Sequence, residues 1–329
     1  MSDDEPADRM RERSPRSTVI LYLLLDADRK LITTGIVGAV FVGLVAASLV
    51  VPGAESALRA TDSVDTAFQA LIGATVTGVT LVLTLNQLVL SQELGAVGDQ
   101  RERMDGAMTF RDDVRDLLGE TPPAEPSEFL QAMVAEIDSR AAAVRDSGPL
   151  DDDLETMIEG TVSNADVVIE RLEDADFGEF EVVRAALDFN YSWKIHVARR
   201  FLDGELPDET REPLAAFADA LELFGPTREH FKTLYFQSEL IDLSRTVLYT
   251  AVPSLVVALG VTFYVDVAIF TDSILGVNTG VLLVTGAAAV VISPFAVLLA
   301  YVLRIATVTE RTLSIGPFIL RETDGETDR

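Results

Sequence analysis

The chain contains no cysteine, and this absence excludes three kinds of chemistry. Without a thiol there is no disulfide bond, no thiolate nucleophile and no zinc or iron–sulfur site built on cysteine ligands. Histidine is scarce as well: His196 and His230 stand outside any HExxH or HxxxH pattern. We interpret both histidines as residues on helix faces at the edge of a packed core, not as ligands or general bases.

Basic residues are the second shortage. The chain has 26 lysines and arginines but 53 aspartates and glutamates, which gives a net charge of −27. This charge repels phosphate backbones, so nucleic acid is excluded as a partner. Only Lys30, Lys194 and Lys232 are lysines. An acidic, lysine-poor surface suits multimolar salt, where the Debye length falls to about 3 Å and self-repulsion is screened. We therefore expect a halophilic, archaeal source.

Motifs for catalysis and cofactor binding are also missing. The sequence contains no P-loop, no GxSxG elbow and no EF-hand loop with its central glycine. Clusters of carboxylates such as Asp151 to Asp153 are expected on solvated faces or at helix starts in so acidic a chain. The sequence therefore predicts that the protein is not an enzyme, and it indicates neither a cofactor nor a metal.

Four apolar runs are long enough to cross a bilayer. They predict transmembrane helices at residues 31–51, 67–92, 246–270 and 275–303. The second would form a helix about 39 Å long, against about 30 Å of hydrocarbon. Pro253 and Pro294 fall inside the third and fourth spans, where each removes a backbone donor, and we expect both to bend their helices.

The predicted fold class is all-α, with four transmembrane helices and a cytosolic helical bundle inserted between spans two and three. We divide the chain into a disordered tail (1–17), transmembrane helices 1 and 2 with a short outer loop (18–92), the cytosolic bundle (93–245), transmembrane helices 3 and 4 (246–303) and a cytosolic C-terminal tail (304–329). Residues 18–25 predict a short interfacial helix, and residues 315–320 an apolar segment that docks on the bundle or the interface. The last residues, 322–329, are expected to be disordered.

The distribution of arginine and lysine predicts the orientation of the spans. Basic residues precede spans one and three and follow spans two and four, whereas only Arg59 lies between spans one and two and none lies between spans three and four. By the positive-inside rule both termini and residues 93–245 are predicted to be cytoplasmic. The protein is thus expected to be a multi-pass protein of the cell membrane, with the lipid bilayer as its first partner.

Residues 93–245 predict helices only, because apolar residues recur at three- and four-residue spacing and no run alternates with period two. One apolar face comprises Leu130, Val134, Ile137, Ala141 and Val144, and another comprises Leu154, Ile158, Ala165, Ile169 and Leu172. Prolines and glycines divide the segment into helices near 94–118, 127–146, 151–174, 179–202, 209–224 and from 227 onward. No proline or glycine lies between residues 91 and 94 or between residues 243 and 248. Spans two and three are therefore predicted to continue unbroken into the bundle.

Span two carries polar side chains along one side. Thr77, Thr80, Thr84, Gln87 and Ser91 recur at spacings of three and four, which places them on one stripe of a helix. Two interpretations are open. The hydroxyls can bond to their own helix while the amide bonds to a neighbouring one, which cements a helix bundle. Alternatively, copies of this helix around a symmetry axis line an uncharged pore, which requires a homo-oligomer.

Span one carries a stripe of small residues. Gly35, Ala39, Gly43 and Ala47 recur every four residues, and a shorter stripe of Ala70, Ala74 and Gly78 occurs on span two. Small residues at this spacing let two helices approach closely in a membrane. We expect spans one and two to pack against each other here.

The single tryptophan lies in a segment that gathers aromatic and basic residues. Tyr191 and Trp193 are followed by Arg199 and Arg200. Aromatic rings beside arginine suit a recognition patch for a ligand or a partner protein. The same residues also fit a bundle core with a charged flank, and the sequence leaves both interpretations open.

Two runs carry a resemblance to known proteins. LTLNQLVLSQELGAVGDQRERMDGAM at 83–108 and RTLSIGPFIL at 311–320 resemble a family of uncharacterised multi-span membrane proteins of haloarchaea. The resemblance covers most of the chain and implies origin and topology, not an activity. The plan of four spans with a helical cytosolic domain is also similar to that of bestrophin-type anion channels, by architecture alone.

Two functions fit these features. The first is a membrane-anchored helical interaction or sensory module with a cytosolic protein partner, since a large bundle without catalytic residues is typical of binding. The second is an oligomeric ion channel whose pore is lined by the polar stripe of span two. The channel requires several subunits, and we expect the protein to be a homo-oligomer.

Overall fold

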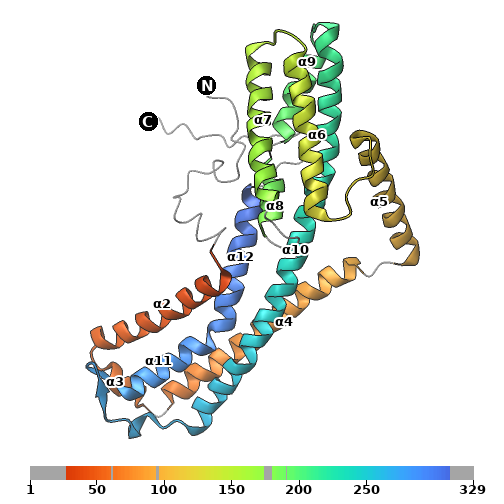
Figure 1. Ribbon diagram of the computed structural model, residues 1–329. Coiled ribbons are helices and arrows are strands. Elements are labelled where there is room, and N and C mark those ends of the chain that lie inside the picture. The colour runs from red at the N-terminus through yellow and green to blue at the C-terminus, as the bar shows by residue number, and fades with distance from the viewer. Residues whose placement is uncertain (1–26, 61, 94–95, 174–179, 190, 312–329) are drawn as a thin grey trace. The chain divides into compact units, whose positions relative to one another are not determined.

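The computed structural model describes residues 27–60, 62–93, 96–173, 180–189 and 191–311 (Figure 1). The predicted tails at 1–17 and 322–329, the interfacial helix at 18–25 and the docking segment at 315–320 lie outside these residues. The regular secondary structure of the described part is helical apart from one short hairpin, β1 (Ser273–Ile274) paired antiparallel with β2 (Val277–Asn278). The predicted all-α class is confirmed.

The chain forms two compact units. The bundle unit is built on residues 95–236, and the apolar unit on residues 17–94 and 237–308. Helix α10 (Asp208–Tyr264) is continuous and contributes to both units, with its residues up to Phe236 in the first and those from Gln237 in the second.

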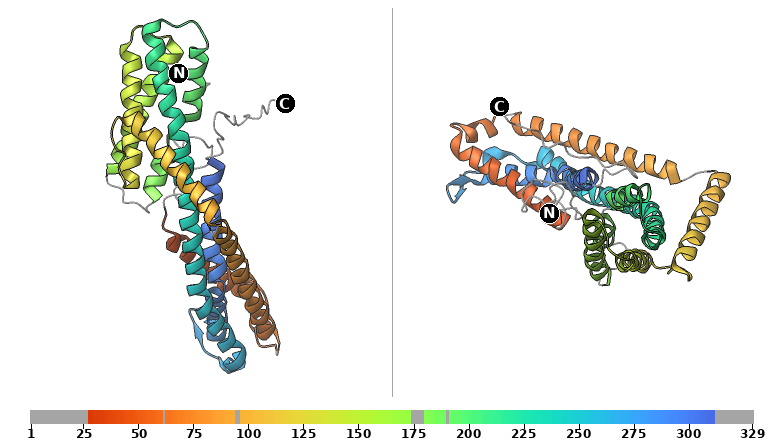
Figure 2. Two further views of the ribbon diagram at one scale, coloured as in Figure 1. Left: turned by 90° about the vertical axis from the view of Figure 1, so that its right-hand side faces the viewer. Right: turned by 90° about the horizontal axis from the view of Figure 1, so that it is seen from above.

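The bundle unit is made of the helices α5 (Val97–Leu118), α6 (Pro126–Asp146), α7 (Asp152–Glu173), α8 (Phe180–Leu187), α9 (Tyr191–Leu202) and the first part of α10. Helices α6, α7 and this part of α10 lie side by side, whereas α5 leans away from them (Figures 1 and 2) and contacts α6 through Phe110 and Phe129. The start of α6 shows the local cause: the Glu125 carboxylate accepts the N–H of Glu128 at 2.8 Å, and Pro126 takes the first helical position, where no N–H is needed.

The two predicted apolar faces meet in the core of this unit. Leu130, Ile137 and Val144 of α6 are fully buried, as are Leu154, Ile158 and Ala165 of α7. Phe217 and Phe224 of α10 are fully buried in the same core. The periodicity therefore predicted which side of each helix is covered.

The predicted break at Gly225-Pro226 is wrong, because α10 runs through it. A proline usually pushes the preceding residue out of helical geometry by a clash with its Cβ, and glycine has no Cβ. A Cβ at position 225 would also lie 2.9 Å from the ring of Tyr191. Packing of Phe224 and Phe231 on either side of the proline holds the helix in the core.

The predicted helix at 179–202 is instead two helices, α8 and α9. Asp188 lies at the break and pairs with Arg171 of α7, while Phe189 is fully buried. The side chain of Asp188 must reach Arg171, and the adjacent side chain of Phe189 must reach the core. Adjacent side chains of one straight helix point in different directions and would not meet both requirements, so the helix breaks here.

The predicted continuity of span two into the bundle is also wrong. Helix α4 (Ser63–Glu93) ends before α5, and Ala96, the N-cap of α5, has extended backbone geometry. The corresponding prediction for span three is confirmed, because α10 is unbroken from Asp208 to Tyr264.

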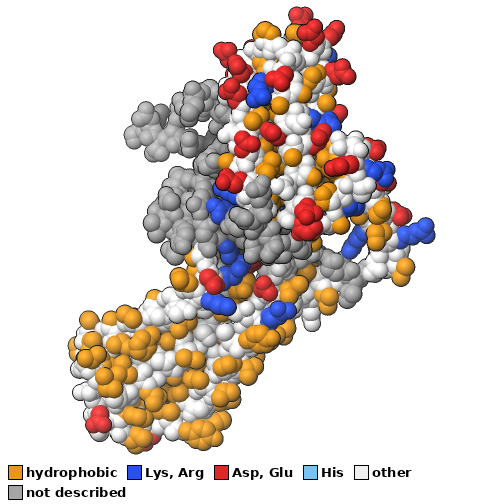
Figure 3. Space-filling model, viewed as in Figure 1, with side chains coloured by type: hydrophobic (Ala, Val, Ile, Leu, Met, Phe, Trp, Pro, Cys, Tyr) orange, Lys and Arg blue, Asp and Glu red, His pale blue; other side chains and the backbone are white. Residues whose placement is uncertain are grey.

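The apolar unit contains α2 (Arg29–Val50), α3 (Ala54–Leu58), α4, the second part of α10, the 3₁₀ turn η2 (Val267–Ile269), the hairpin, α11 (Thr279–Val291) and α12 (Ser293–Arg311). Three helices of the described chain are long and apolar enough to cross a membrane: α2, α4 and α10. A fourth span results if α11 and α12, which meet at a bend of 44°, count as one. Hydrophobic side chains are spread over the visible surface of this unit, among few charged ones (Figure 3).

The loops of the apolar unit are tied together by polar contacts. The amide of Asn278 donates to Glu55 Oε1 at 2.9 Å and to the carbonyl of Phe270 at 3.1 Å. Arg59 donates to the same carbonyl at 3.2 Å. These bonds connect α3 with the segment before the hairpin.

Candidate functional site

Helix α4 packs on the rest of the apolar unit along one narrow face. Val64, Phe68, Thr75 and Val82 are buried, and they recur at spacings of four and seven residues. Phe68 lies in a cluster with residues of α10 and α11, and Val82 in a cluster with residues of α10 and α12. This face holds α4 against three helices.

The predicted polar stripe lies on the opposite side of α4. Thr77, Thr80, Thr84, Gln87 and Ser91 are all exposed. At about 100° per residue, Thr84 points about 180° away from the buried Thr75, and the other four lie within about 60° of that direction. The structure thus brings the five residues together on one outward face, which we call the α4 polar face.

The hydroxyls of the α4 polar face bond to their own helix. Thr77 donates to the carbonyl of Gly73 at 2.8 Å, and Thr80 and Thr84 donate to the carbonyls four residues before them at 2.9 Å. Ser91 donates to the carbonyl of Leu88 at 2.7 Å. Each hydroxyl keeps an acceptor lone pair on the outer surface.

Gln87 differs from the hydroxyls of this face. Its amide carries two N–H donors and a carbonyl acceptor, and it makes no hydrogen bond within the described residues. An amide without a partner costs several kcal/mol in hydrocarbon. The α4 polar face therefore has unused hydrogen-bonding capacity, and Gln87 holds most of it.

The small-residue stripe of α2 faces outward too. Gly35, Ala39, Gly43 and Ala47 are exposed, and a Cβ added at either glycine meets nothing within 4 Å. Helix α2 packs on α11, which lies between α2 and α4 (Figures 1 and 2). The predicted packing of spans one and two through this stripe is wrong within one chain, because α2 uses its bulkier side, including Phe41, against α11.

An ion pair at the start of α2 was not predicted from the sequence. The guanidinium of Arg29 bonds to the carboxylate of Glu239 in α10 and lies 5.0 Å from the ring centroid of Tyr301 in α12. Glu239 is 5% exposed. The position of Glu239 just before an apolar run was a signal in the sequence that could have indicated this pair. However, Glu239 is one of many acidic residues in this chain.

The bend between α11 and α12 was predicted from the sequence, but the contact from α10 that supports it was not. Pro294 has no N–H to donate to the carbonyl of Val290 four residues earlier. The fully buried Ser254 of α10 places its hydroxyl 3.0 Å from that oxygen and 2.8 Å from the carbonyl of Thr250. The prediction of a bend at Pro294 is confirmed; at Pro253, α10 continues without a break.

The structure does not assemble the predicted recognition patch. Tyr191 is buried against Phe224, and Trp193 packs on the bundle core. Arg199 is on the surface and bonds to Glu222, which raises the pKa of Arg199. Arg200 bonds to Asp153 at 3.0 Å. The aromatic residues thus belong to the core, and the arginines are engaged by acidic neighbours.

The described residues contain no group of three or more histidine, aspartate or glutamate side chains that could hold a metal ion. His196 and His230 are both exposed on helices of the bundle unit. The α4 polar face is thus the strongest candidate site in the described structure.

Comparison with known proteins gives a family but no activity. No curated protein and no solved structure matches the chain. A family model described as a family of unknown function (DUF7972) matches residues 1–329. The chain therefore belongs to this family of unknown function, DUF7972.

Proposed function

We propose that the protein is a multi-pass protein of the cell membrane with four spans: α2, α4, the second part of α10, and α11 with α12 as one bent span. The apolar surface of these helices supports the proposal, because soluble proteins rarely expose apolar patches of this extent. Both termini and residues 93–245 are proposed to be cytoplasmic, from the distribution of basic residues. The acidic composition supports a haloarchaeal source.

We further propose that the protein works as a homo-oligomeric, membrane-anchored interaction module. The observation that carries this proposal is the exposed α4 polar face. Inside a bilayer, this face needs a polar partner, and the described part of its own chain covers only the opposite side of α4. A second copy of α4 supplies amide and hydroxyl groups of matching chemistry. The cytosolic bundle is then the part that binds a protein partner.

The absence of cysteine makes self-association directly testable. A Thr84→Cys chain carries one thiol on the α4 polar face, and Leu83→Cys carries one at almost the same depth, about 100° around the helix. Upon oxidation in native membranes, we expect Thr84→Cys to form cross-linked dimers at least fivefold more than Leu83→Cys. Equal cross-linking of the two variants, or none, would contradict the proposed interface.

The second candidate function is a channel lined by the same face. The face is continuous from Thr77 to Ser91, about 21 Å along the helix axis, which covers most of a bilayer core. Around a symmetry axis, its hydroxyls would line a column of water. Purified protein in liposomes should then conduct ions, and Thr84→Leu or Gln87→Leu should alter the conductance.

The two candidates give different results. A cross-linked oligomer that is electrically silent supports the interaction module, and pull-down from native membranes in high salt should then recover a cytosolic protein. A conducting oligomer whose current depends on Gln87 supports the channel. A protein that is monomeric in the membrane would rule out both the homo-oligomeric interaction module and the channel.

A further inference from the structure

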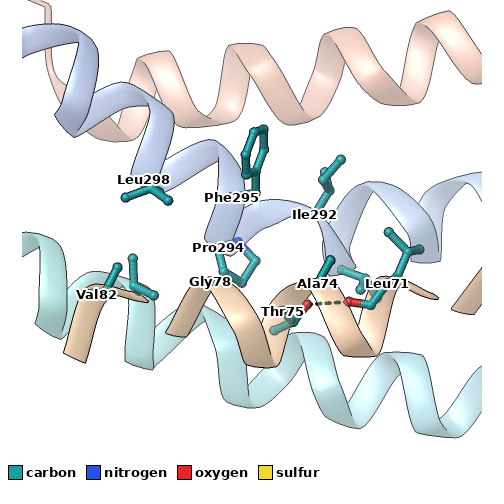
Figure 4. Close-up of a pocket in the computed structure, with 11 residues that line it drawn as sticks. Leu71, Ala74, Thr75, Gly78, Val82, Ile292, Pro294, Phe295 and Leu298 are labelled. Atoms are coloured by element: carbon teal, nitrogen blue, oxygen red, sulfur yellow. Dashed lines mark hydrogen bonds between the residues drawn. The ribbon is translucent and has the colours of Figure 1, made fainter. Parts of the chain in front are cut away.

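An apolar cavity of about 160 Å³ lies beside the bend between α11 and α12. Figure 4 shows that α4 forms one wall, with Ala74 and Gly78, and that Pro294 and Leu298 of α12 lie on the side that faces it, while the ring of Phe295 points away from α4. Val247 adds a surface from α10. All these residues belong to the apolar unit.

The chemistry of the cavity excludes a polar ligand. Among the described residues that line the cavity, Thr75 alone has a polar side chain, and its hydroxyl donates to the carbonyl of Leu71 at 2.9 Å (Figure 4). A buried water needs two to four polar partners, which this lining does not provide. The cavity is therefore dry and suited to hydrocarbon.

The space is available to an entering group. A Cβ added at Gly78 meets no atom within 4 Å. Ala74 and Phe295 line the cavity and are also exposed, so the cavity reaches the outer apolar surface of the unit. In a membrane, that surface faces lipid.

We propose that this cavity binds the terminal part of a hydrocarbon chain of a membrane lipid; this rests on the proposed insertion of the apolar unit in a bilayer. An apolar cavity of about 150 Å³ holds one benzene molecule, so about six carbon atoms fit here. The bilayer presents such chains at this depth without any opening to water. The chain end contacts Pro294 and Leu298 and fills the angle of the bend.

The proposal is tested with a phospholipid that carries a diazirine at the end of one acyl chain. The full-length protein is reconstituted in vesicles containing this lipid, irradiated and mapped by mass spectrometry. We expect labelling to be concentrated on Pro294 and Leu298, which line the cavity and are less exposed than Phe295. Gly78→Leu, which fills the cavity, should reduce this labelling at least fivefold. Gly38→Leu on exposed α2, where an added Cβ also meets nothing within 4 Å, should leave it unchanged.

A second variant covers the case in which Gly78→Leu does not fold. Leu298→Ala enlarges the cavity and should increase labelling of its other lining residues. Even labelling over all exposed apolar helices, or equal labelling in wild type and both cavity variants, would overturn the proposal. Release of the protein by an alkaline wash would instead refute membrane insertion. Concentrated labelling without Thr84→Cys cross-linking would support the cavity and refute self-association.

Discussion

The hydroxyl of Ser254 in α10 lies 3.0 Å from the carbonyl oxygen of Val290 in α11. Pro294 leaves that oxygen without its usual helical donor, and Ser254 supplies one from a neighbouring helix. A residue 36 positions earlier in the chain thus stabilises the bend of the fourth apolar helix.

We expect Ser254→Ala to destabilise the apolar unit by about 0.6–1.7 kcal/mol, the range of interhelical hydrogen bonds in membranes. Pro294→Ala restores an N–H four residues after Val290, so Ser254→Ala should cost less in that background. Thermal unfolding of the four proteins of this cycle in detergent measures the coupling. If Ser254→Ala lowers the stability equally in wild type and in Pro294→Ala, the hydroxyl of Ser254 does not stabilise the carbonyl of Val290.

The pair of Arg29 and Glu239 provides a second prediction. Arg29→Leu leaves a nearly buried carboxylate without its partner, and we expect a loss of about 3–5 kcal/mol. The double variant Arg29→Leu/Glu239→Leu should recover most of that loss, because two apolar side chains replace both charges. Chemical denaturation in detergent gives the comparison. A double variant as unstable as Arg29→Leu would contradict this account.

We predict that the bundle unit requires glycine at position 225, because the ring of Tyr191 lies close to it. A Cβ at this position would lie 2.9 Å from the buried ring of Tyr191, so Gly225→Ala should destabilise the bundle unit by about 1–3 kcal/mol. Gly106→Ala in α5 is the matched control, since its Cβ meets nothing within 4 Å and alanine favours helix by up to about 1 kcal/mol. Fluorescence of Trp193, the single tryptophan, follows unfolding of the full-length protein.

Asp138 of the bundle unit predicts a dependence of stability on pH. Burial and the nearby charge of Asp166 raise the pKa of its carboxyl group, and its Oδ1 is buried without a hydrogen bond within the described residues. The ionised form is thus disfavoured in the folded state. Above that pKa the charge destabilises the fold, and this cost declines as the pH falls from the folded-state pKa to the ordinary pKa of the unfolded chain.

Asp138→Asn should therefore raise the unfolding temperature at neutral pH by about 1–2 °C. The difference from wild type should shrink as the pH is lowered below the folded-state pKa. Asp146→Asn at the end of α6, an exposed residue, serves as the control and should change little. A benefit of Asp138→Asn that grows on acidification would have the wrong sign for this explanation.

Much of the helical structure could be predicted because it depends on neighbours three and four residues apart. The ends of α6 and α7 agree with prediction within one residue, and Leu130, Ile137 and Leu154 are buried as expected. The errors at Gly225 and Asp188 have another origin. There, core packing of neighbouring phenylalanines or an ion pair with a distant helix overrides the local preference.

The α4 polar face shows the same division. The sequence by itself determined that Thr77, Thr80, Thr84, Gln87 and Ser91 share one side of a helix, because the helical repeat is a local property. Only the tertiary structure decided that this side faces outward, since α10, α11 and α12 pack on Phe68 and Val82 instead. It likewise decided that α2 packs on α11, and that Ser254 serves Val290. Such pairings depend on how distant side chains fit together, which no local pattern encodes.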